Sequence, residues 1–463
     1  MLAMRERCGV RSLIPPLGRR AWWLFFGYTL QKLGYGFTSP FLIIYLHDVR
    51  GMDLGTAGLV LATSSAGGML AVAAVGGLTD RIGAGRTLVL SLVAGAVGVT
   101  VYATVQAPWA AFLAAALDGA GMAGMWSAFS SLLAVAVPPA QRSGAFAVSF
   151  LLLNLGIGLG AATGGLVVNV HSLASFQLVF LLNAAGSLLL AALVVALGEA
   201  RHSGPAPRPA PPAPSVTTAA SAPSAASGPR ATAGGDASGY RAVLKDRALV
   251  AVMAVNTLIA FVTVAYFSTA FPAWVTGPAG ASTRVVGLAT TANTALIVFG
   301  QLFVLRYLLL GRRRTRAIAV AVLIYGAAML ITLLAGAAGG GALTAAVLIA
   351  ALSIYGLGET LLQPGIVALV NDLAPDALRG RYNAVFNLSW QVGPIIGPAV
   401  VGAMLNRGLY AAVFTGMAAM CGLVALLVLG LERLIPAQAN MGQGVGRSLT
   451  TLGPGEARSG DSA

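Results

Sequence analysis

The clearest indication of the fold is a stretch that occurs twice, as PPAQRSGAFAVSFLLLNLGIGLGAATGG at 138–165 and as PDALRGRYNAVFNLSWQVGPIIGPAVVG at 375–402. With a shift of 237 residues and no gap, ten of the 28 positions are identical. The identical residues include a proline, an arginine and three glycines, which chance similarity between apolar helices does not readily place in register. The chain therefore consists of two related halves, and parallel repeats are a known architecture of membrane transporters.

Around these repeats, the chain consists mostly of apolar runs long enough to cross a bilayer. About 20 apolar residues suffice for a helix that spans the hydrocarbon core. Helices are expected because a helix satisfies its own backbone hydrogen bonds in lipid, whereas barrel strands would be shorter and alternate in polarity. The sequence predicts an all-α membrane protein with twelve spans in two six-helix bundles, at 21–46, 54–75, 87–105, 109–137, 144–168, 176–197, 248–273, 285–309, 317–335, 342–370, 382–404 and 409–431.

The composition supports this interpretation. Hydrophobic residues make up 57% of the 463 residues and charged residues only 9%, and the mean hydropathy is +0.84. A soluble domain has about a quarter charged residues, so a water-soluble fold of this size is excluded. The net charge of +14 does not indicate nucleic-acid binding, because the basic residues recur between apolar runs instead of gathering on one soluble face.

The distribution of arginines predicts the orientation in the membrane. Cytoplasmic loops carry an excess of Lys and Arg. The sequence assigns to one side Arg5, Arg7, Arg11, Arg19, Arg20, Arg81, Arg86, Arg142, Arg306, Arg312, Arg313, Arg314, Arg316, Arg379, Arg381 and Arg433, and to the other only Arg50, Arg284 and Arg407. Both termini are therefore expected in the cytoplasm. The preference for Arg over Lys, with abundant Ala and Gly, favours a bacterial plasma-membrane protein.

A central segment rich in Pro, Ala, Ser and Gly separates the two halves. Such a composition cannot bury a core and is typical of a disordered linker. The predicted organisation is a cytoplasmic N-terminal tail (1–20), a six-helix bundle (21–200), a disordered cytoplasmic linker (201–245), a second six-helix bundle (246–435) and a cytoplasmic tail (436–463).

The segment after the second predicted helix, GGLTDRIGAGR at 76–86, carries a recognisable motif. Its glycines permit a tight turn, and its acid and base can pair across helix ends. It resembles the signature G-x-L-a-D-R-x-G-R-K of the major facilitator superfamily. The resemblance implies a conformational latch that locks the two halves in the outward-facing state; an ordinary solvated charge pair is the alternative. The latch residues are Gly76, Asp80, Arg81, Gly83 and, one place later than in the signature, Arg86.

A second motif lies in the repeated stretch. Glycines four apart let helices approach closely. The pattern resembles the antiporter motif of the twelve-helix drug:proton antiporter branch, g-x-x-x-G-P-x-x-G-G, with Ala161 in place of the proline. Ordinary small-residue packing is the alternative. The motif residues are Gly156, Gly160, Gly164 and Gly165, repeated in the second half by Gly393 and Gly397.

Three ionisable residues stand inside predicted spans, where such residues are costly and indicate function. They are Lys32, Asp118 and Glu359, in spans one, four and ten. In the superfamily, helices one, four, seven and ten line a central cavity. Burial favours the neutral form of a carboxyl group, so Glu359 and Asp118 are candidates to exchange a proton with substrate. Lys32 is expected to pair with one of them; a permanent bridge that only fixes helix register is the alternative.

Polar, aromatic and methionine side chains share helix faces with these three residues. Methionines and aromatic rings form an adaptable apolar surface, which suits a hydrophobic or amphiphilic substrate. Simple helix packing is the alternative for the methionine and aromatic positions. The candidate cavity residues are Tyr28, Gln31, Tyr35, Met122, Trp126, Tyr355 and Gln363.

Together these features predict a secondary transporter that exports hydrophobic or cationic small molecules, such as drugs or metabolites, in exchange for protons. Drug-efflux members carry an arginine in helix four where this chain has Leu117, next to Asp118, so proton-coupled uptake of a metabolite stays open. A non-transporting membrane sensor or scaffold is a third reading. We expect no enzymatic activity, cofactor, metal site or nucleic-acid partner, and a monomer whose partners are substrate, protons and lipid.

Overall fold

The computed structural model describes residues 17–138, 141–199, 243–307, 313–336, 340–375 and 378–441, and every long element within them is a helix. Most of the expected N-terminal tail, linker and C-terminal tail lies outside the described residues. At their described edges, α1 begins two residues inside the expected tail, residues 243–245 form a helical turn, and α17 is a short helix after residue 436.

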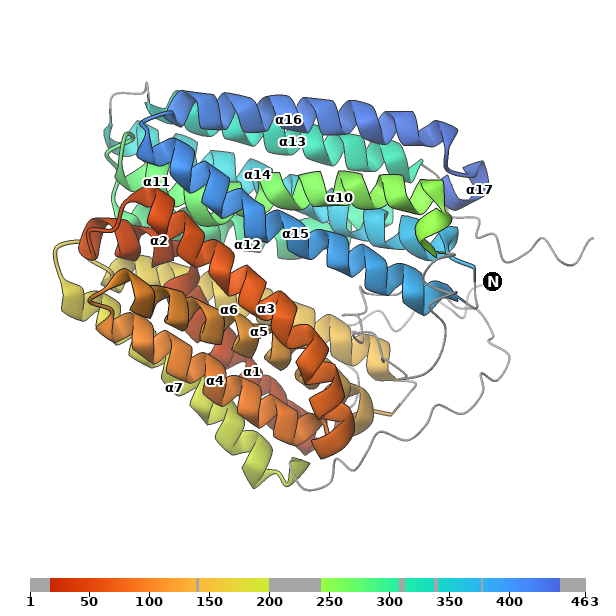
Figure 1. Ribbon diagram of the computed structural model, residues 1–463, viewed down its shortest axis with the longest axis horizontal. Coiled ribbons are helices and arrows are strands. Elements are labelled where there is room, and N and C mark those ends of the chain that lie inside the picture. The colour runs from red at the N-terminus through yellow and green to blue at the C-terminus, as the bar shows by residue number, and fades with distance from the viewer. Residues whose placement is uncertain are drawn as a thin grey trace, which may run out of the picture.

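The first half contains six segments of spanning length (Figure 1). The first is interrupted near its end, because Pro40 has no backbone N–H to continue the helical ladder. The elements are α1 (Arg19–Thr38), η2 (Ser39–Phe41), α2 (Leu42–Ile44), η3 (Tyr45–Val49), α3 (Leu54–Ile82), α4 (Ala84–Thr104), α5 (Pro108–Ala136), α6 (Arg142–Val167) and α7 (Leu173–Ala196).

The second half repeats this arrangement, and its first spanning segment is again irregular near the same end. There a π-helical turn precedes Pro272. The elements are α10 (Arg247–Ala265), η5 (Tyr266–Ala270), α11 (Phe271–Thr276), α12 (Thr283–Tyr307), α13 (Arg314–Ala335), α14 (Gly341–Leu373), α15 (Arg379–Asn406), α16 (Tyr410–Gly430), η8 (Leu431–Arg433) and α17 (Ala437–Asn440).

Ten described helices are long and apolar enough to cross a membrane on their own. The two remaining long segments are α1 with its continuation to Val49, and α12. Both are helical over a spanning length, and both lie against helices of the apolar set, α1 against α6 and α7, and α12 against α6 and α14. The twelve predicted spans therefore each correspond to one helical segment of the structure.

One predicted boundary is wrong. The sequence predicts that the second span ends at 75 and that 76–86 form a turn, but α3 continues to Ile82. Gly76, Asp80 and Arg81 therefore lie in the last turns of a helix. The chain reverses at Gly83 alone, whose φ of 88° is readily adopted only by glycine, and α4 begins at the next residue. Glycine costs a helix about 1 kcal/mol per residue relative to alanine, so two glycines do not by themselves end one.

The two halves contact each other mainly along two helix pairs, α3 with α15 and α6 with α12. We call the end of the molecule with the turns at 50–53, 168–172, 277–282 and 407–409 the joined end. Figure 1 shows α3 and α15 close together there and separating toward the opposite end. We call that opposite end, where α1 and α10 begin and α7 ends, the terminal end.

Small residues allow the close approach at the joined end. A Cβ added at Gly402 of α15 would lie 3.0 Å from the Cα of Gly58 of α3. A Cβ added at Gly165 of α6 would lie 3.1 Å from the Cα of Gly287 of α12. Real Cβ atoms rarely lie so close to backbone atoms, so side chains at these crossings would push the halves apart.

Candidate functional site

The ammonium of Lys32 lies inside a cage of aromatic rings. Its Nζ is 4.9 Å from the ring centroid of Trp126, 5.3 Å from that of Tyr28 and 5.7 Å from that of Tyr35. The nearest polar contact is the sulfur of Met122, at 3.7 Å. Only 1% of Lys32 is exposed. The negative faces of the rings attract a cation and offset part of the cost of removing the ammonium from water.

The cage is rigid at one wall. The ring of Tyr28 stacks on Phe129 of α5, with centroids 4.3 Å apart and planes 9° from parallel. Tyr28 and Lys32 are one helical turn apart on α1, and Met122 and Trp126 are one turn apart on α5. The cage is therefore built from one face of each of two helices, and we call Tyr28, Tyr35, Met122 and Trp126 the aromatic cage.

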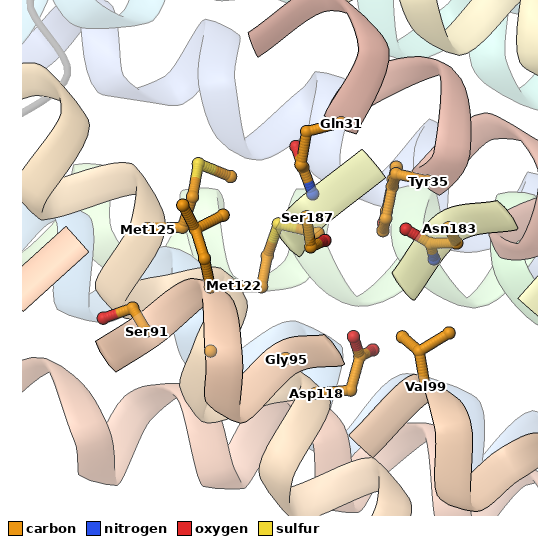
Figure 2. Close-up of a pocket in the computed structure, with 12 residues that line it drawn as sticks. Gln31, Tyr35, Ser91, Gly95, Val99, Asp118, Met122, Met125, Asn183 and Ser187 are labelled. Carbon is orange, nitrogen blue, oxygen red and sulfur yellow. The ribbon is translucent and has the colours of Figure 1, made fainter. Parts of the chain in front are cut away.

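Asp118 lines a small cavity next to this cage (Figure 2). Its volume, about 20 Å³ for the centre of a water-sized sphere, is enough for one water molecule. Figure 2 shows the Asp118 carboxylate pointing toward the side of the cavity where Tyr35, Asn183 and Val99 lie. The cavity lies within the first half, between α1, α4, α5 and α7, and its polar lining residues are Gln31, Tyr35, Ser91, Asp118, Asn183 and Ser187.

Lys32 and Asp118 interact electrostatically, but among the described residues no ion pair within 4.0 Å joins them. Nor does a hydrogen bond to the Asp118 carboxylate occur in the described part of the chain. The oxygen Oε1 of Gln31, at the cavity wall, is also buried, and none of the described residues hydrogen-bonds to it. A buried polar group without a partner costs about 1–3 kcal/mol, so this cavity holds unused hydrogen-bonding capacity.

Glu359 lies in the second half, on α14, beside a cluster of tyrosines. Tyr325 and Tyr355 interact electrostatically with its carboxyl group, and their ring centroids are 4.6 Å apart. Tyr266 completes the cluster, 5.3 Å from Tyr355. Within the described ranges, neither a hydrogen bond nor an ion pair to Glu359 occurs. The two candidate carboxylates thus lie in different halves, and Lys32 contacts the half that holds Asp118.

The remaining cavity candidates have different surroundings. Gln31 is buried beside Asp118, while Trp126 is 37% exposed. Tyr355 is buried, and its hydroxyl donates to the backbone oxygen of Thr263 at 3.4 Å. Gln363 is half-buried one turn after Glu359 on α14. The structure therefore groups Tyr28, Gln31, Tyr35, Met122 and Trp126 with Lys32 and Asp118, and it groups Tyr355 and Gln363 with Glu359.

The latch residues lie at the terminal end, where α3 ends and α4 begins. Gly83 makes the turn, and Asp80 and Arg81 precede it on α3. Arg86 follows in the first turn of α4. Asp80 and Arg86 both take part in interactions.

The glycines of the antiporter-like motif have two separate faces. Gly156, Gly160 and Gly164 lie against α1 of the same half. Of the four motif glycines of α6, Gly165 alone faces α12 across the interface. Gly158 and Ala161, which lie within the same stretch of α6, also face α12. In the second half, Gly393 and Gly397 likewise lie against α10. The motif thus serves mainly the packing of each bundle around its first helix.

Several residues of the site were missed by the sequence analysis. Ser91 of α4, and Asn183 and Ser187 of α7, line the cavity although their helices are the third and sixth spans. Tyr102 of α4 has a buried hydroxyl with no hydrogen-bond partner in the described part of the chain, and it interacts electrostatically with Asp118. Polarity within an apolar run is the only sequence signal these residues carry, and it does not distinguish them from helix-packing groups.

Two six-helix bundles with parallel internal repeats, ionisable residues within the spans and helix crossings between the bundles at one end define a multi-pass membrane transporter. Comparison with known proteins identifies the family. The sequence profile of the Major Facilitator Superfamily matches residues 24–276 and 253–452. The chain belongs to this superfamily: it is a secondary transporter of a small-molecule substrate, and not an enzyme.

Relatives and solved structures agree with this assignment. The uncharacterized MFS-type transporter YttB of Bacillus subtilis is 25% identical over 391 residues, 83% of this chain and 88% of that protein. A Na(+), Li(+), K(+)/H(+) antiporter of Planococcus maritimus is 30% identical over 148 residues, 30% of this chain and 34% of that protein.

Two solved structures show the same fold. The peptide transporter POT in complex with sulfate has a TM-score of 0.70 and 18% identity, covering 92% of this chain and 98% of that one. The nucleoside transporter NupG has a TM-score of 0.66 and 16% identity, covering 89% and 99%. At this level of identity the likeness concerns the fold alone.

Proposed function

We propose that this transporter exports hydrophobic or cationic small molecules in exchange for protons, with Glu359 and Asp118 as the groups that bind and release the protons. The observation that carries the proposal is that both carboxyl groups lie within the spans with no hydrogen-bond or ion-pair partner among the described residues. A carboxyl group in such surroundings changes its charge readily when water or a cation approaches. Aromatic rings and a methionine next to Asp118 supply an apolar wall for the substrate.

The proposed orientation places the terminal end in the cytoplasm, following the excess of arginines there. The joined end then faces the outside, and the structure represents a state that is closed to the outside. In such a state, the carboxyl groups would exchange protons with the cytoplasm. Export then requires the joined end to open, the substrate to leave and a proton to enter before the return.

The relative with Na(+), Li(+), K(+)/H(+) antiport in its name supports exchange of a cation for protons. Because the match covers 30% of this chain, we take from it support for antiport and not the identity of the transported cation. The aromatic cage points to a larger and less hydrated cation than an alkali metal ion.

The test uses the full chain in proteoliposomes with a pH dye inside and an imposed inside-acid gradient. Lipophilic cations are added outside to wild type, Glu359→Gln and Asp118→Asn. We expect a cation-triggered proton efflux in wild type. In at least one of the two variants it should fall about 100-fold or more, because the group that transfers the proton is gone.

Asp372→Asn provides the matched control, because that carboxylate already pairs with Arg314 at 2.6 Å near the terminal end. Asp372→Asn should retain proton flux if only carboxyl groups without a partner among the described residues transfer protons. Full flux in both Glu359→Gln and Asp118→Asn would overturn the assignment of the proton-binding groups. Substrate and proton moving in the same direction would replace export by proton-coupled uptake.

A further inference from the structure

The aromatic cage already holds a cation, and that cation belongs to the protein. Three rings from α1 and α5 converge on the Nζ of Lys32 at 4.9–5.7 Å, with the Met122 sulfur at 3.7 Å. Converging aromatic faces are the arrangement with which proteins recognise quaternary and methylated ammonium ligands. The ammonium of Lys32 therefore occupies the position that the ammonium group of a ligand would occupy.

We propose that this cage is the binding site for an organic ammonium substrate, and that Lys32 is a tethered competitor that occupies the site until substrate arrives. The inference rests on the proposed export function and names its substrate class. The cage supplies π faces and one sulfur, whereas small hard cations require several oxygen ligands. A weakly hydrated ammonium with apolar substituents matches these contacts.

A second position for the displaced ammonium lies next to the cage. The cavity lined by Gln31, Tyr35, Asp118 and Met122 shares two residues with the cage. It offers the Asp118 carboxylate and the partner-free Oε1 of Gln31 as hydrogen-bond acceptors. When substrate enters the cage, the Lys32 ammonium moves into this cavity and pairs with Asp118.

This movement couples substrate to proton one for one. Before binding, Asp118 is protonated and neutral, and Lys32 is charged in the cage. Afterwards the substrate cation is in the cage, Lys32⁺ pairs with Asp118⁻, and one proton has left the Asp118 carboxyl group for water. One positive charge enters and one leaves, so the step is electroneutral.

The titratable groups facing the pair are few. Tyr28 and Tyr35 flank Lys32 on α1, and Tyr102 of α4 interacts with Asp118. On α7, the cavity is lined by Asn183 and Ser187, which do not titrate. On α6, Lys32 lies against Gly156. Among the described residues that these contacts name, Asp118 is the one carboxyl group beside Lys32. One proton is therefore released for each substrate molecule that binds.

The chain provides an internal control for a direct test, because Lys32 and Lys245 are its only lysines. Lys245 is exposed, at the terminal end before α10. The purified full-length protein is acetylated with an amine-reactive ester, and the rate at each lysine is followed by mass spectrometry. Benzyltrimethylammonium is the probe, and neopentylbenzene, its neutral isostere, is the control ligand.

Saturating benzyltrimethylammonium should lower the acetylation rate of Lys32 about tenfold while Lys245 stays unchanged, because the displaced amine is held as an ammonium beside Asp118⁻ and an ammonium does not react with the ester. Neopentylbenzene should change neither rate. In equilibrium dialysis, Lys32→Met should bind the probe about tenfold more tightly than wild type, since the competitor is gone. Trp126→Ala should bind it about tenfold more weakly, within the range for loss of one cation–π contact. Lys245→Met should match wild type.

An unchanged or faster acetylation of Lys32 at saturating probe would overturn the proposal, and so would absence of probe binding. The acetylation arm uses wild-type protein, so it stands even where Lys32→Met does not fold. Dialysis and acetylation need no gradient. Displacement of Lys32 without proton exchange in proteoliposomes would refute proton-coupled export alone, whereas proton exchange without displacement would refute the tethered competitor alone.

Discussion

Gly156 and Gly393 have the same place in the two halves, yet they lie against different residues. A Cβ added at Gly156 would be 2.7 Å from the Cβ of Lys32, and one added at Gly393 would be 2.6 Å from the Cβ of Ala260. The packing of each bundle around its first helix is thus repeated, whereas the charge is not. The repeat preserves the packing around the first helix of each half but not the charged side chain.

The carboxylates differ between the halves in the same way. The shift of 237 residues that aligns the repeats places Tyr355 opposite Asp118 and Glu359 opposite Met122. The carboxylate of the second half is therefore displaced by one helical turn, about 6 Å, relative to that of the first. Asp118 has a lysine nearby and Glu359 has a group of tyrosines. Equivalent helices thus carry two carboxyl groups in chemically distinct surroundings.

The largest effect is expected from locking the two crossings between the halves. A Cβ added at Gly55 would be 3.6 Å from the Cα of Ala403, and one added at Gly158 would be 3.3 Å from the Cβ of Thr294. Cysteines at either pair are within reach of a disulfide. Each pair, in a background without the native Cys8 and Cys421, should abolish transport on oxidation and recover it on reduction.

The two crossings make each pair the control for the other. If only the Gly55→Cys and Ala403→Cys pair blocked transport, the α3–α15 crossing would open while α6–α12 stayed closed. Undiminished transport with both disulfides formed would show that the joined end does not open during the cycle. Cross-linking is followed by gel mobility after cleavage in the segment between the halves.

A smaller effect is expected from side chains added at the crossings. Gly402→Val would place its Cβ 3.0 Å from the Cα of Gly58. Gly165→Val would place its Cβ 3.1 Å from the Cα of Gly287 and 3.2 Å from the oxygen of Thr283. Overpacking costs about 1–3 kcal/mol, so both variants should lower the thermal unfolding temperature in detergent, Gly402→Val more. Gly416→Val is the control, because nothing lies within 4 Å of its added Cβ. Equal stability of Gly402→Val and Gly416→Val would contradict the tight crossing.

The smallest effect concerns the aspartates that cap one helix in each half. Asp53 caps α3 by accepting from the Thr56 amide at 2.9 Å, and Asp246 caps α10 by accepting from Ala248 at 2.9 Å. Asp246 also accepts from the Tyr382 hydroxyl of α15, at 2.7 Å. Replacement by alanine should cost about 1 kcal/mol at Asp53 and more at Asp246, measured by thermal unfolding.

The Asp53 cap also predicts a pH dependence. Hydrogen bonds from the Thr56 side chain and backbone amide hold the pKa of Asp53 below its ordinary value of 3.8. The stabilisation is therefore present in full above about pH 5 and is lost as the pH falls through the lowered pKa. The difference between wild type and Asp53→Ala should shrink over that acidic window. A difference that grew on acidification would exclude the cap as its source.

The sequence predicts the fold well because the signal in lipid is simple. Apolar length alone locates the spans, and the shift between repeats identifies the halves. The boundary at 75 was wrong since two adjacent glycines suggest a turn, whereas the helix continues through them and Gly83 makes the reversal. Local sequence does not reveal which glycine takes the left-handed conformation.

The site was predictable only along single helices. Tyr28, Lys32 and Tyr35 on one helix, and Asp118, Met122 and Trp126 on another, follow from helical spacing. That Lys32 lies among rings and not in an ion pair depends on how α1 and α5 rotate against each other. The contribution of Ser91 and Asn183 depends on which faces of α4 and α7 turn inward, which near-uniform apolar helices do not specify.

The seal at the joined end has a consequence for the environment in which this transporter works. Its contacts are between small residues and backbone atoms, with hydrogen bonds from the hydroxyls of Thr283 and Thr291 to the backbone oxygens of Val168 and Gly158 at 3.0 and 2.8 Å. At that end no ion pair joins the halves among the described residues. The ion pairs of Arg313 and Arg316 with Glu432 at the terminal end lie within the second half. Ionic strength screens exposed ion pairs and leaves van der Waals packing unaffected. The contacts that join the halves at this end should therefore hold equally well in fresh water and in brine.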